Sequence, residues 1–494
     1  MAEVLRDSVN PRRLRRMHER VAQAFERRTP EAAAEIATHY DRGGNSDKAY
    51  RYAILAADRA KGVYAHTEGT EFLRIAERNA ASPAQLADVR VRLAHIAEAV
   101  GQYVEAQELC DLAIEWFDTQ GDKRRALTLR RMRERARMEQ GQPARATLDS
   151  LKALDDEART LGFDRERVTI LTMASQTHGR LGDQRTAERI ASECVDMAER
   201  IGDRLLLAES LNRYCVSMLQ ATPARAREIA IRALHLYEGA GDVRGQARCY
   251  INLGVATQLE GKIPEAVRAM TMAVSVCRAA GMPDLWGMAA LNFGVLSQKS
   301  GDYDKAREQF GEAIELFASV KNSQMQLAAL YNMAHVEREL GAWDSAIDLY
   351  EATSPLAQRV GQSDIEIGSV AGIGLSLLEL GRVADARARL AEAEERVAAR
   401  PDWFQGRELV EALAVRLAVL DGRVDEARSR IDMALTLAEP TEVYAAAWLT
   451  AVCADAFSGI DPAWVQSSIS RYAAEVGKLG YAEMARRYEI LAKR

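Results

Sequence analysis

Cysteines, histidines and aromatic residues are scarce in this 494-residue chain. Aromatic residues make up 6% of it, and the six cysteines form no C-x-x-C pair. We therefore expect no disulfide framework and no zinc site, and we interpret the cysteines as reduced core residues of helices. The seven histidines are scattered as well, and His18-Glu19 lacks the second histidine of a metalloprotease helix. The sequence predicts neither a metal site nor a cofactor.

Long apolar runs, strand-forming runs and an excess of basic residues are missing too. No apolar run approaches the roughly 18 residues of a membrane span, and no signal peptide opens the chain. We therefore expect a cytoplasmic protein without a membrane partner. The formal net charge of −6 argues against direct electrostatic binding of nucleic acid. The chain is rich in Ala, Leu, Arg and Glu, a composition that is typical of helical proteins.

No catalytic motif stands out. Residues 254–263 (GVATQLEGKI) superficially resemble a phosphate-binding loop, but their glycines are seven residues apart and Ile263 replaces the required Ser or Thr. There is also no Ser/His/Asp or Cys/His spacing of the kind that supports nucleophilic catalysis. We predict that the chain is not an enzyme.

A repeat of about 40 residues runs through the sequence. Between residues 241 and 347 one pattern is found twice and begun a third time, and three columns recur at a step of 40. The columns are Asn252, Asn292 and Asn332; Gly261, Gly301 and Gly341; and Ala266, Ala306 and Ala346. The Gly-x-x-x-x-Ala pair recurs from Gly44 to Gly422, with Ala221 in the glycine column of one unit. A fixed period of this length is the signature of a solenoid.

A second set of glycines lies half a period away from the first, as in GD at 121 and 202. Because Gly readily ends a helix, two such signals per repeat predict two helices per repeat, each about 18 residues or roughly 27 Å long. Gly254 and Gly294, within first helices, would let neighbouring helices approach closely. We expect an all-α solenoid of about eleven helical pairs. Its repeats would cover 81–440, with a distinct N-terminal helical region at 1–80 and irregular capping helices at 441–494.

The run Tyr250-Ile251-Asn252-Leu253-Gly254, followed by Gly261 and Ala266, resembles the tetratricopeptide repeat. That resemblance implies a right-handed superhelix whose first helices line a concave groove. These repeats are about six residues longer than the usual length. The long form resembles the sensor regions of bacterial STAND-class signalling ATPases and maltose-activator-like regulators. The region 1–80 resembles the junction between ATPase and repeats, so we expect Met1 to lie near a cut through a larger protein or to begin a stand-alone descendant.

The asparagine column carries the main binding hypothesis. With Asn212 it places four amides on one line down the first helices, and Asn is a poor helix former that needs an offsetting role. An amide offers a donor and an acceptor, which match the backbone of an extended peptide. The alternative is that each amide bonds the backbone of the next repeat and only fixes stacking. The expected groove residues are Asn212, Asn252, Asn292, Asn332, Gln258, Gln298, Tyr331, His335 and Arg338.

One helix, at 122–141, carries eight basic and three acidic side chains. Arg131 and Arg135 occupy positions that face the groove in the tetratricopeptide family. There they could contact an anion, since Arg binds carboxylates and phosphates in a bidentate manner. The alternative is a solvated helix face with i,i+4 ion pairs, such as Glu134 with Arg130.

Together these features indicate a recognition module without catalytic activity. The favoured function is the sensor region of a bacterial signalling or transcription-regulating protein that binds a protein, a peptide or a small effector. A neutral, partly apolar groove suits such ligands. The alternative is a constitutive assembly scaffold with no regulatory ligand.

Overall fold

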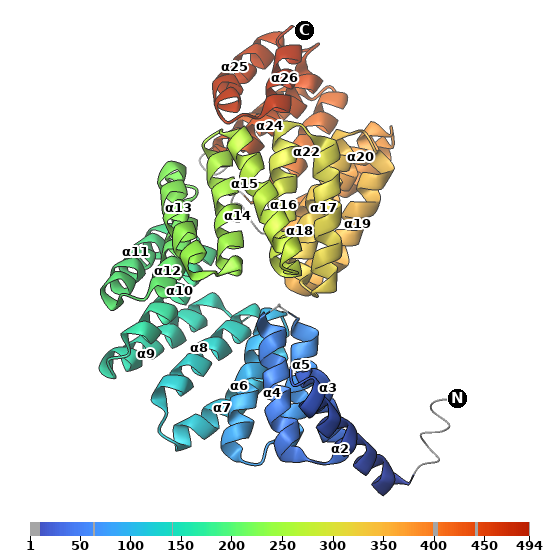
Figure 1. Cartoon of the computed structure of the whole chain (residues 1–494). Coiled ribbons are helices and arrows are strands. Elements are labelled where there is room, and N and C mark those ends of the chain that lie inside the picture. Colours follow the sequence, from blue (N-terminus) through green and yellow to red (C-terminus); the bar gives the residue numbers. More distant parts are fainter. Residues whose placement is uncertain (1–9, 63–64, 141, 399–403, 440–442, 494) are drawn as a thin grey trace. The chain divides into compact units, whose positions relative to one another are not determined.

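Helices fill nearly all of the chain in the computed structural model, which describes residues 10–62, 65–140, 142–398, 404–439 and 443–493. These residues form 25 helices and no strand, which confirms the predicted all-α solenoid of paired helices (Figure 1). The helices are α2 (Pro11–Arg28), α3 (Ala33–Gly43), α4 (Ser46–Gly62), α5 (His66–Asn79), α6 (Pro83–Ala99), α7 (Tyr103–Thr119), α8 (Lys123–Glu139), α9 (Ala144–Thr160), α10 (Asp164–Arg180), α11 (Gln184–Ile201), α12 (Arg204–Met218), α13 (Pro223–Ala240), α14 (Val243–Leu259), α15 (Ile263–Ala279), α16 (Pro283–Ser300), α17 (Tyr303–Ser319), α18 (Ser323–Glu339), α19 (Trp343–Val360), α20 (Ser363–Glu379), α21 (Val383–Val397), α22 (Arg407–Leu420), α23 (Val424–Ala438), α24 (Val443–Phe457), α25 (Pro462–Lys478) and α26 (Ala482–Leu491).

The chain folds into two compact units. Unit 1 contains the described residues of Met1–Met218, Arg232–Gly245 and Ala279–Met282. Unit 2 contains those of Leu219–Ile231, Gln246–Arg278 and Pro283–Arg494. Within each unit, helices that follow one another in the chain pack side by side, as α7 does on α8 and α16 on α17 (Figure 1).

Glycines end the helices at the predicted places. Gly261 has φ +74° and Gly121, in the half-period set, has φ +71°, and only glycine adopts this left-handed region without strain. Lys321 stands at the corresponding half-period position of its repeat and takes φ +56° without that freedom. Gly141, another member of the glycine column, lies outside the described residues. The left-handed backbone conformation at the helix end is therefore kept even where Lys321 replaces the glycine.

Small residues hold the helices of a repeat close together. Ala266, Ala306 and Ala346 are completely buried between the helices of their hairpins. A Cβ placed on Gly254 would lie 2.6 Å from Met270 Cε, and one on Gly294 would lie 2.5 Å from Phe310 Cε1. Both distances are too short for a side chain, so these glycines serve the close approach that the sequence predicts.

All six cysteines are buried and none forms a disulfide, as expected for reduced core residues. Among the described residues, no group of three or more His, Cys, Asp and Glu side chains is arranged to hold a metal ion. No described helix combines the length and the apolar character that a membrane crossing requires.

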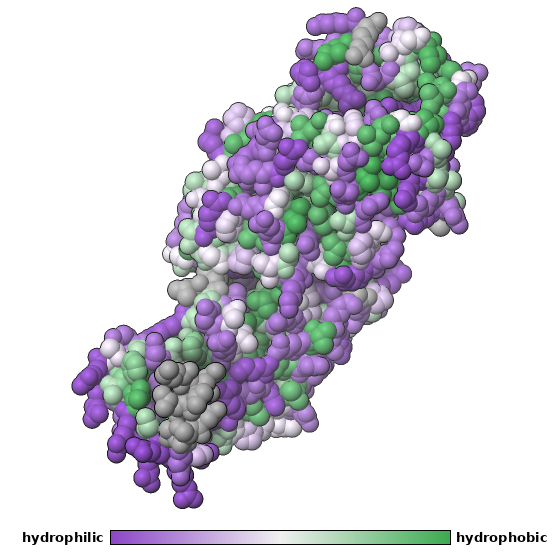
Figure 2. All heavy atoms as spheres, turned by 90° about the vertical axis from the view of Figure 1, so that its right-hand side faces the viewer, coloured by the Kyte–Doolittle hydropathy of each residue, from purple (hydrophilic) through white to green (hydrophobic). Residues whose placement is uncertain are grey.

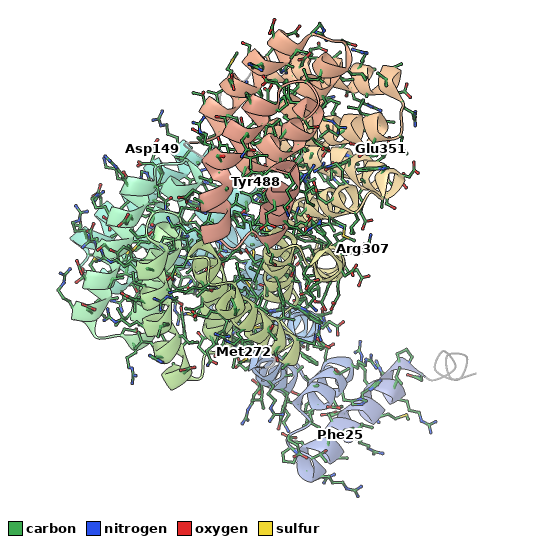
Figure 3. All side chains as sticks on the ribbon, turned by 90° about the horizontal axis from the view of Figure 1, so that it is seen from above. Phe25, Asp149, Met272, Arg307, Glu351 and Tyr488 are labelled. Carbon is green, nitrogen blue, oxygen red and sulfur yellow. The ribbon has the colours of Figure 1, made fainter. Side chains whose placement is uncertain are left out.

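The surface is mostly hydrophilic, with small apolar patches scattered between charged side chains (Figure 2). The second helices of the repeats carry much of this exposed surface. Met272 of α15 and Glu351 of α19, for example, point to solvent (Figure 3). The first helices instead carry the side chains of the candidate site.

Candidate functional site

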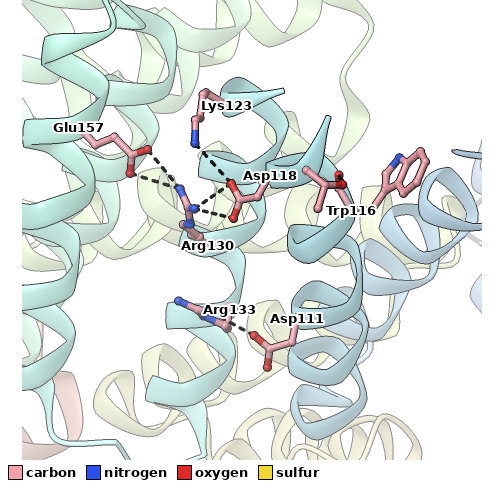
Figure 4. Close-up of polar contacts among 8 residues, drawn as sticks. Asp111, Trp116, Asp118, Lys123, Arg130, Arg133 and Glu157 are labelled. Carbon is pink, nitrogen blue, oxygen red and sulfur yellow. Dashed lines mark hydrogen bonds and ion pairs between the residues drawn. The ribbon is translucent and has the colours of Figure 1, made fainter. Parts of the chain in front are cut away.

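Most arginines of the basic helix α8 pair with acidic residues of neighbouring helices. Arg130 donates to Asp118 of α7 at 2.8 Å and to Glu157 of α9 at 3.2 Å, and Arg133 donates to Asp111 at 3.1 Å (Figure 4). Glu134, which the sequence suggested as a partner of Arg130, pairs with Arg137 at 3.1 Å. These ion pairs tie neighbouring helices of unit 1 together, so this part of the charge cluster is structural.

Arg131 and Arg135 lie on the remaining face of α8 and are not neutralised in the same way. Arg135 Nε is 3.6 Å from Glu98 Oε1 of α6, longer than a hydrogen bond. Arg131 Nε is buried, and no described residue accepts a hydrogen bond from it. Burial lowers the pKa of Arg131, and the nearest charges are those of Glu98, Arg135 and Glu209. Charged side chains of α6, α8 and α12 therefore lie near the half-buried side chain of Arg131.

Arg213 of α12 adds a second group of this kind, which the sequence analysis missed. Its Nε is buried without a hydrogen-bond partner among the described residues. Burial lowers its pKa, and the positive charge of Arg180 lowers it further. A desolvated arginine binds a carboxylate or phosphate strongly because little water has to be displaced. Unit 1 can thus hold an anionic group on its first helices. Arg213 could have been noticed only as the neighbour of Asn212.

The asparagine column is half-buried, and two of its amides bond within their own helices. Asn292 Nδ2 donates to the carbonyl of Met288, and Asn332 Nδ2 donates to that of Ala328, each at 2.8 Å. These contacts differ from the alternative given above, in which each amide would bond the backbone of the next repeat and fix the stacking of the repeats. Since an amide has two N–H donors and one acceptor, each bond uses only part of its capacity. Asn212 and Asn252 are half-buried as well.

Two other expected groove residues, Tyr331 and His335, pack among the helices of unit 2. Tyr331 is 2% exposed and its hydroxyl lies against Gly368 and Gly406, where no Cβ would fit. The ring of His335 packs 4.5 Å from Tyr331 and 5.8 Å from Tyr350, measured between centroids. Burial lowers the pKa of His335 to about 3, so the imidazole is neutral at pH 7. Tyr331 is thus buried against the repeats that follow, whereas His335 is half-buried beside it.

Arg338 is covered by the C-terminal helices. It lies 4.8 Å from the ring of Trp448, on α24, and donates to Glu339 at 2.8 Å. Gln258 is also buried, whereas Gln298 stays half-buried. The carboxylate of Glu339 additionally accepts from Trp448 Nε1 at 3.1 Å and from Arg487 at 3.5 Å. Sequence reasoning did not find the contacts of Glu339 with Trp448 and Arg487, because these two residues lie 109 and 148 positions away along the chain.

Two of the cavities in unit 2 differ in the residues that line them. One, of about 330 Å³, lies beside Glu339 and is lined by charged groups of both signs, among them Arg416, Arg487 and Glu483. The other, of about 550 Å³, lies between α21, α22 and α23 and has Met433 and Leu437 on its wall. The acidic and basic groups of the first cavity pair with one another, as Arg416 does with Glu379.

Comparisons with known proteins agree with the helical-repeat fold. A tetratricopeptide repeat family model matches residues 287–359. Regulatory protein AfsR of Streptomyces griseus is 26% identical over 203 residues, which are 41% of this chain and 19% of AfsR. The chain thus spans less than a fifth of that relative.

Two solved structures are similar to parts of the chain. A Rap protein complexed with competence and sporulation factor has 16% identity and a TM-score of 0.47, covering 69% of this chain and 99% of the Rap chain. A STAND protein with a tetratricopeptide repeat sensor, from Pyrococcus horikoshii, has 13% identity and a TM-score of 0.40, covering 81% and 54%. The tetratricopeptide repeat match covers residues 287–359, that is α16 to α19 of the helical solenoid.

Proposed function

We propose that the chain is a non-catalytic recognition module of a bacterial signalling or transcription-regulating protein, and that unit 1 binds a protein or peptide partner. The observation that carries the proposal is the contrast between the two faces of α8. Arg130 and Arg133 each donate through a terminal nitrogen to a carboxylate of a neighbouring helix. The Nε atoms of Arg131 and Arg133 are both buried without a hydrogen-bond partner among the described residues, but only Arg133 has its terminal nitrogen bonded to Asp111. Keeping a buried Nε–H group without an acceptor costs stability, which supports a role for Arg131 in binding an external anion.

The ligand that fits these residues is an extended segment with a carboxylate. Its carboxylate would meet Arg131 and Arg135, and backbone amides would meet the half-buried amide of Asn212. The similarity to a regulatory protein supports regulation over the alternative, a constitutive scaffold. The proposal also holds that this binding takes place in the cytoplasm and requires neither nucleic acid nor a cofactor.

Peptide selection on the full chain tests this function. Short random peptides with free C-terminal carboxylates would be selected for binding, and each binder would be measured by fluorescence anisotropy against the unchanged chain and two variants. We expect Arg131→Ala to weaken binding about tenfold or more, since a hydrogen bond to a charged group contributes about 1.5–3 kcal/mol. Arg133→Ala, two residues along the same helix, is the matched control and should bind normally. Selected peptides that bind both variants equally well would contradict the proposal.

A further inference from the structure

The C-terminal helices return to the beginning of unit 2. The turn between α25 and α26 lies on the turn between α14 and α15, where Gly261 contacts the carbonyl of Lys478 and Gly480 packs on Ile263. One repeat further on, a Cβ on Gly301 would lie 2.8 Å from Glu483 Cβ of α26. Residues some 200 positions apart in sequence therefore meet at the ends of the first helices.

Polar contacts hold this arrangement at its centre. The carboxylate of Glu339, at the end of α18, binds Trp448 of α24 and Arg487 of α26. Burial alone would raise the pKa of Glu339, but Arg338 and Arg487 lower it on balance, so the carboxylate is charged. Lys299 of α16 lies 4.9 Å from the ring of Tyr444 and 5.7 Å from that of Tyr481. Both contacts join a first helix of unit 2 to the C-terminal segment.

The first and last helices of the C-terminal segment, α24 and α26, differ in the share of their residues that is buried. α24 has 15 residues, and 11 of them are buried. α26 has 10 residues and buries only Met484, Tyr488 and Leu491, with Tyr481 buried at its N-terminal end. These four residues follow helical spacing, so α26 is an amphipathic helix resting on a surface by one face. Tyr488 donates to the carbonyl of Ala447 at 2.8 Å (Figure 3 labels Tyr488). Removing α26 would leave α24 packed against α22.

We propose that the surface beneath α26, formed by α24, α25 and the ends of α16 and α18, is a docking site for an amphipathic helix, and that α26 is its internal occupant. A partner helix with the same pattern binds there by displacing α26. Its aromatic and aliphatic residues take the places of Tyr481, Met484, Tyr488 and Leu491, and an arginine takes the place of Arg487 opposite Glu339. This site lies within unit 2 and is independent of the arginines of unit 1.

A peptide with the sequence of residues 481–494 is the probe. Its binding to the full chain is measured by fluorescence anisotropy for the unchanged protein, for Arg487→Glu and for Arg486→Glu. Arg487→Glu places a carboxylate against Glu339 and weakens the docking of α26, so the peptide should bind about tenfold more tightly or better. Arg486→Glu is the matched control, because Arg486 pairs with Glu483 and not with the Glu339 carboxylate. It should bind the peptide as the unchanged chain does. A peptide carrying Glu in place of Arg487 should bind none of them.

Hydrogen exchange on the same proteins separates local release from loss of the fold. Release predicts faster exchange in α26 and at the turns of Gly261 and Gly301, with α20 to α23 unchanged. Arg487→Ala is a milder second variant in case Arg487→Glu fails to fold. The proposal is overturned if neither variant binds the peptide better than the unchanged chain does. It is also overturned if exchange rises evenly over unit 2, which would make α26 part of the core. Because the variants and the exchange readout involve only residues of unit 2, this result is independent of the proposed function of unit 1.

Discussion

The same repeat position holds different chemistry in the two units. Arg131 and Tyr331 both stand ten residues before the repeat glycine, and Arg135 and His335 both stand six residues before it. In unit 1 these positions carry guanidinium groups near the carboxylates of neighbouring first helices. In unit 2 they carry aromatic rings packed among the following repeats. The glycine and alanine columns set the backbone of a repeat, and the inner positions are left free to become either a binding surface or a core.

The largest expected effect distinguishes Glu339 of unit 2, which accepts hydrogen bonds from Arg338, Trp448 and Arg487, from Glu98 of unit 1, which lies 3.6 Å from Arg135. Glu339→Ala would leave Arg338 and Trp448 buried without their acceptor, and breaking a buried pair costs about 3 kcal/mol or more. Glu98→Ala removes the partner of Arg135, whose side chain is 42% exposed, so the loss should be about 1 kcal/mol or less. Urea unfolding followed by circular dichroism measures both. Equal losses would mean that Glu339 does not organise unit 2.

Acid should destabilise the two units in different pH ranges. Burial lowers the pKa of His335 to about 3, below its usual 6.5, so the unfolded chain binds the proton first. The stability of unit 2 should therefore fall as the pH drops from about 6.5 towards 3, and His335→Gln should remove that part of the slope. Hydrogen exchange measured unit by unit against pH provides the readout.

Unit 1 should respond at lower pH. Hydrogen bonds from Lys48 and Tyr40 lower the pKa of Glu26 from 4.5 to about 2. The stability that Glu26 contributes should be complete above about pH 4.5 and be lost as the pH falls towards 2. Glu26→Gln should flatten this range and leave the response of unit 2 unchanged. If both units lost protection over one common range, these two residues would not be the titrating groups.

The smallest effect concerns a turn. Lys321 in unit 2 takes φ +56°, whereas Gly281 in unit 1, one repeat earlier, takes φ +62°. A non-glycine residue in this region costs about 1 kcal/mol, so Lys321→Gly should stabilise the protein by up to that amount. Gly281→Lys is the mirror variant and should destabilise it to a similar extent, because open space surrounds Gly281 and only the backbone is strained. Thermal unfolding of both variants checks the sign.

The sequence predicts those features that depend on residues close together in the chain. Helix ends at Gly261 and Gly121, and the close approach at Gly254, are local and recur with the period. The burial of Tyr331 and Arg338 could not be predicted, because it depends on Gly406 and Trp448, which belong to later repeats. The same reason applies to Glu339, whose partners carry no periodic signal. The sequence therefore predicts which residues lie on the first helices at the inner positions of the solenoid. It does not predict whether they are exposed, because their exposure depends on how later repeats pack.

Hydrogen exchange of the full chain with a selected carboxylate peptide tests the central claim most directly. If unit 1 is the recognition surface, protection should appear on α6, α8 and α12 around Arg131 and should disappear in Arg131→Ala. The second helices α9 and α11 should exchange as before. Protection confined to the second helices, or unchanged protection in Arg131→Ala, would contradict the account.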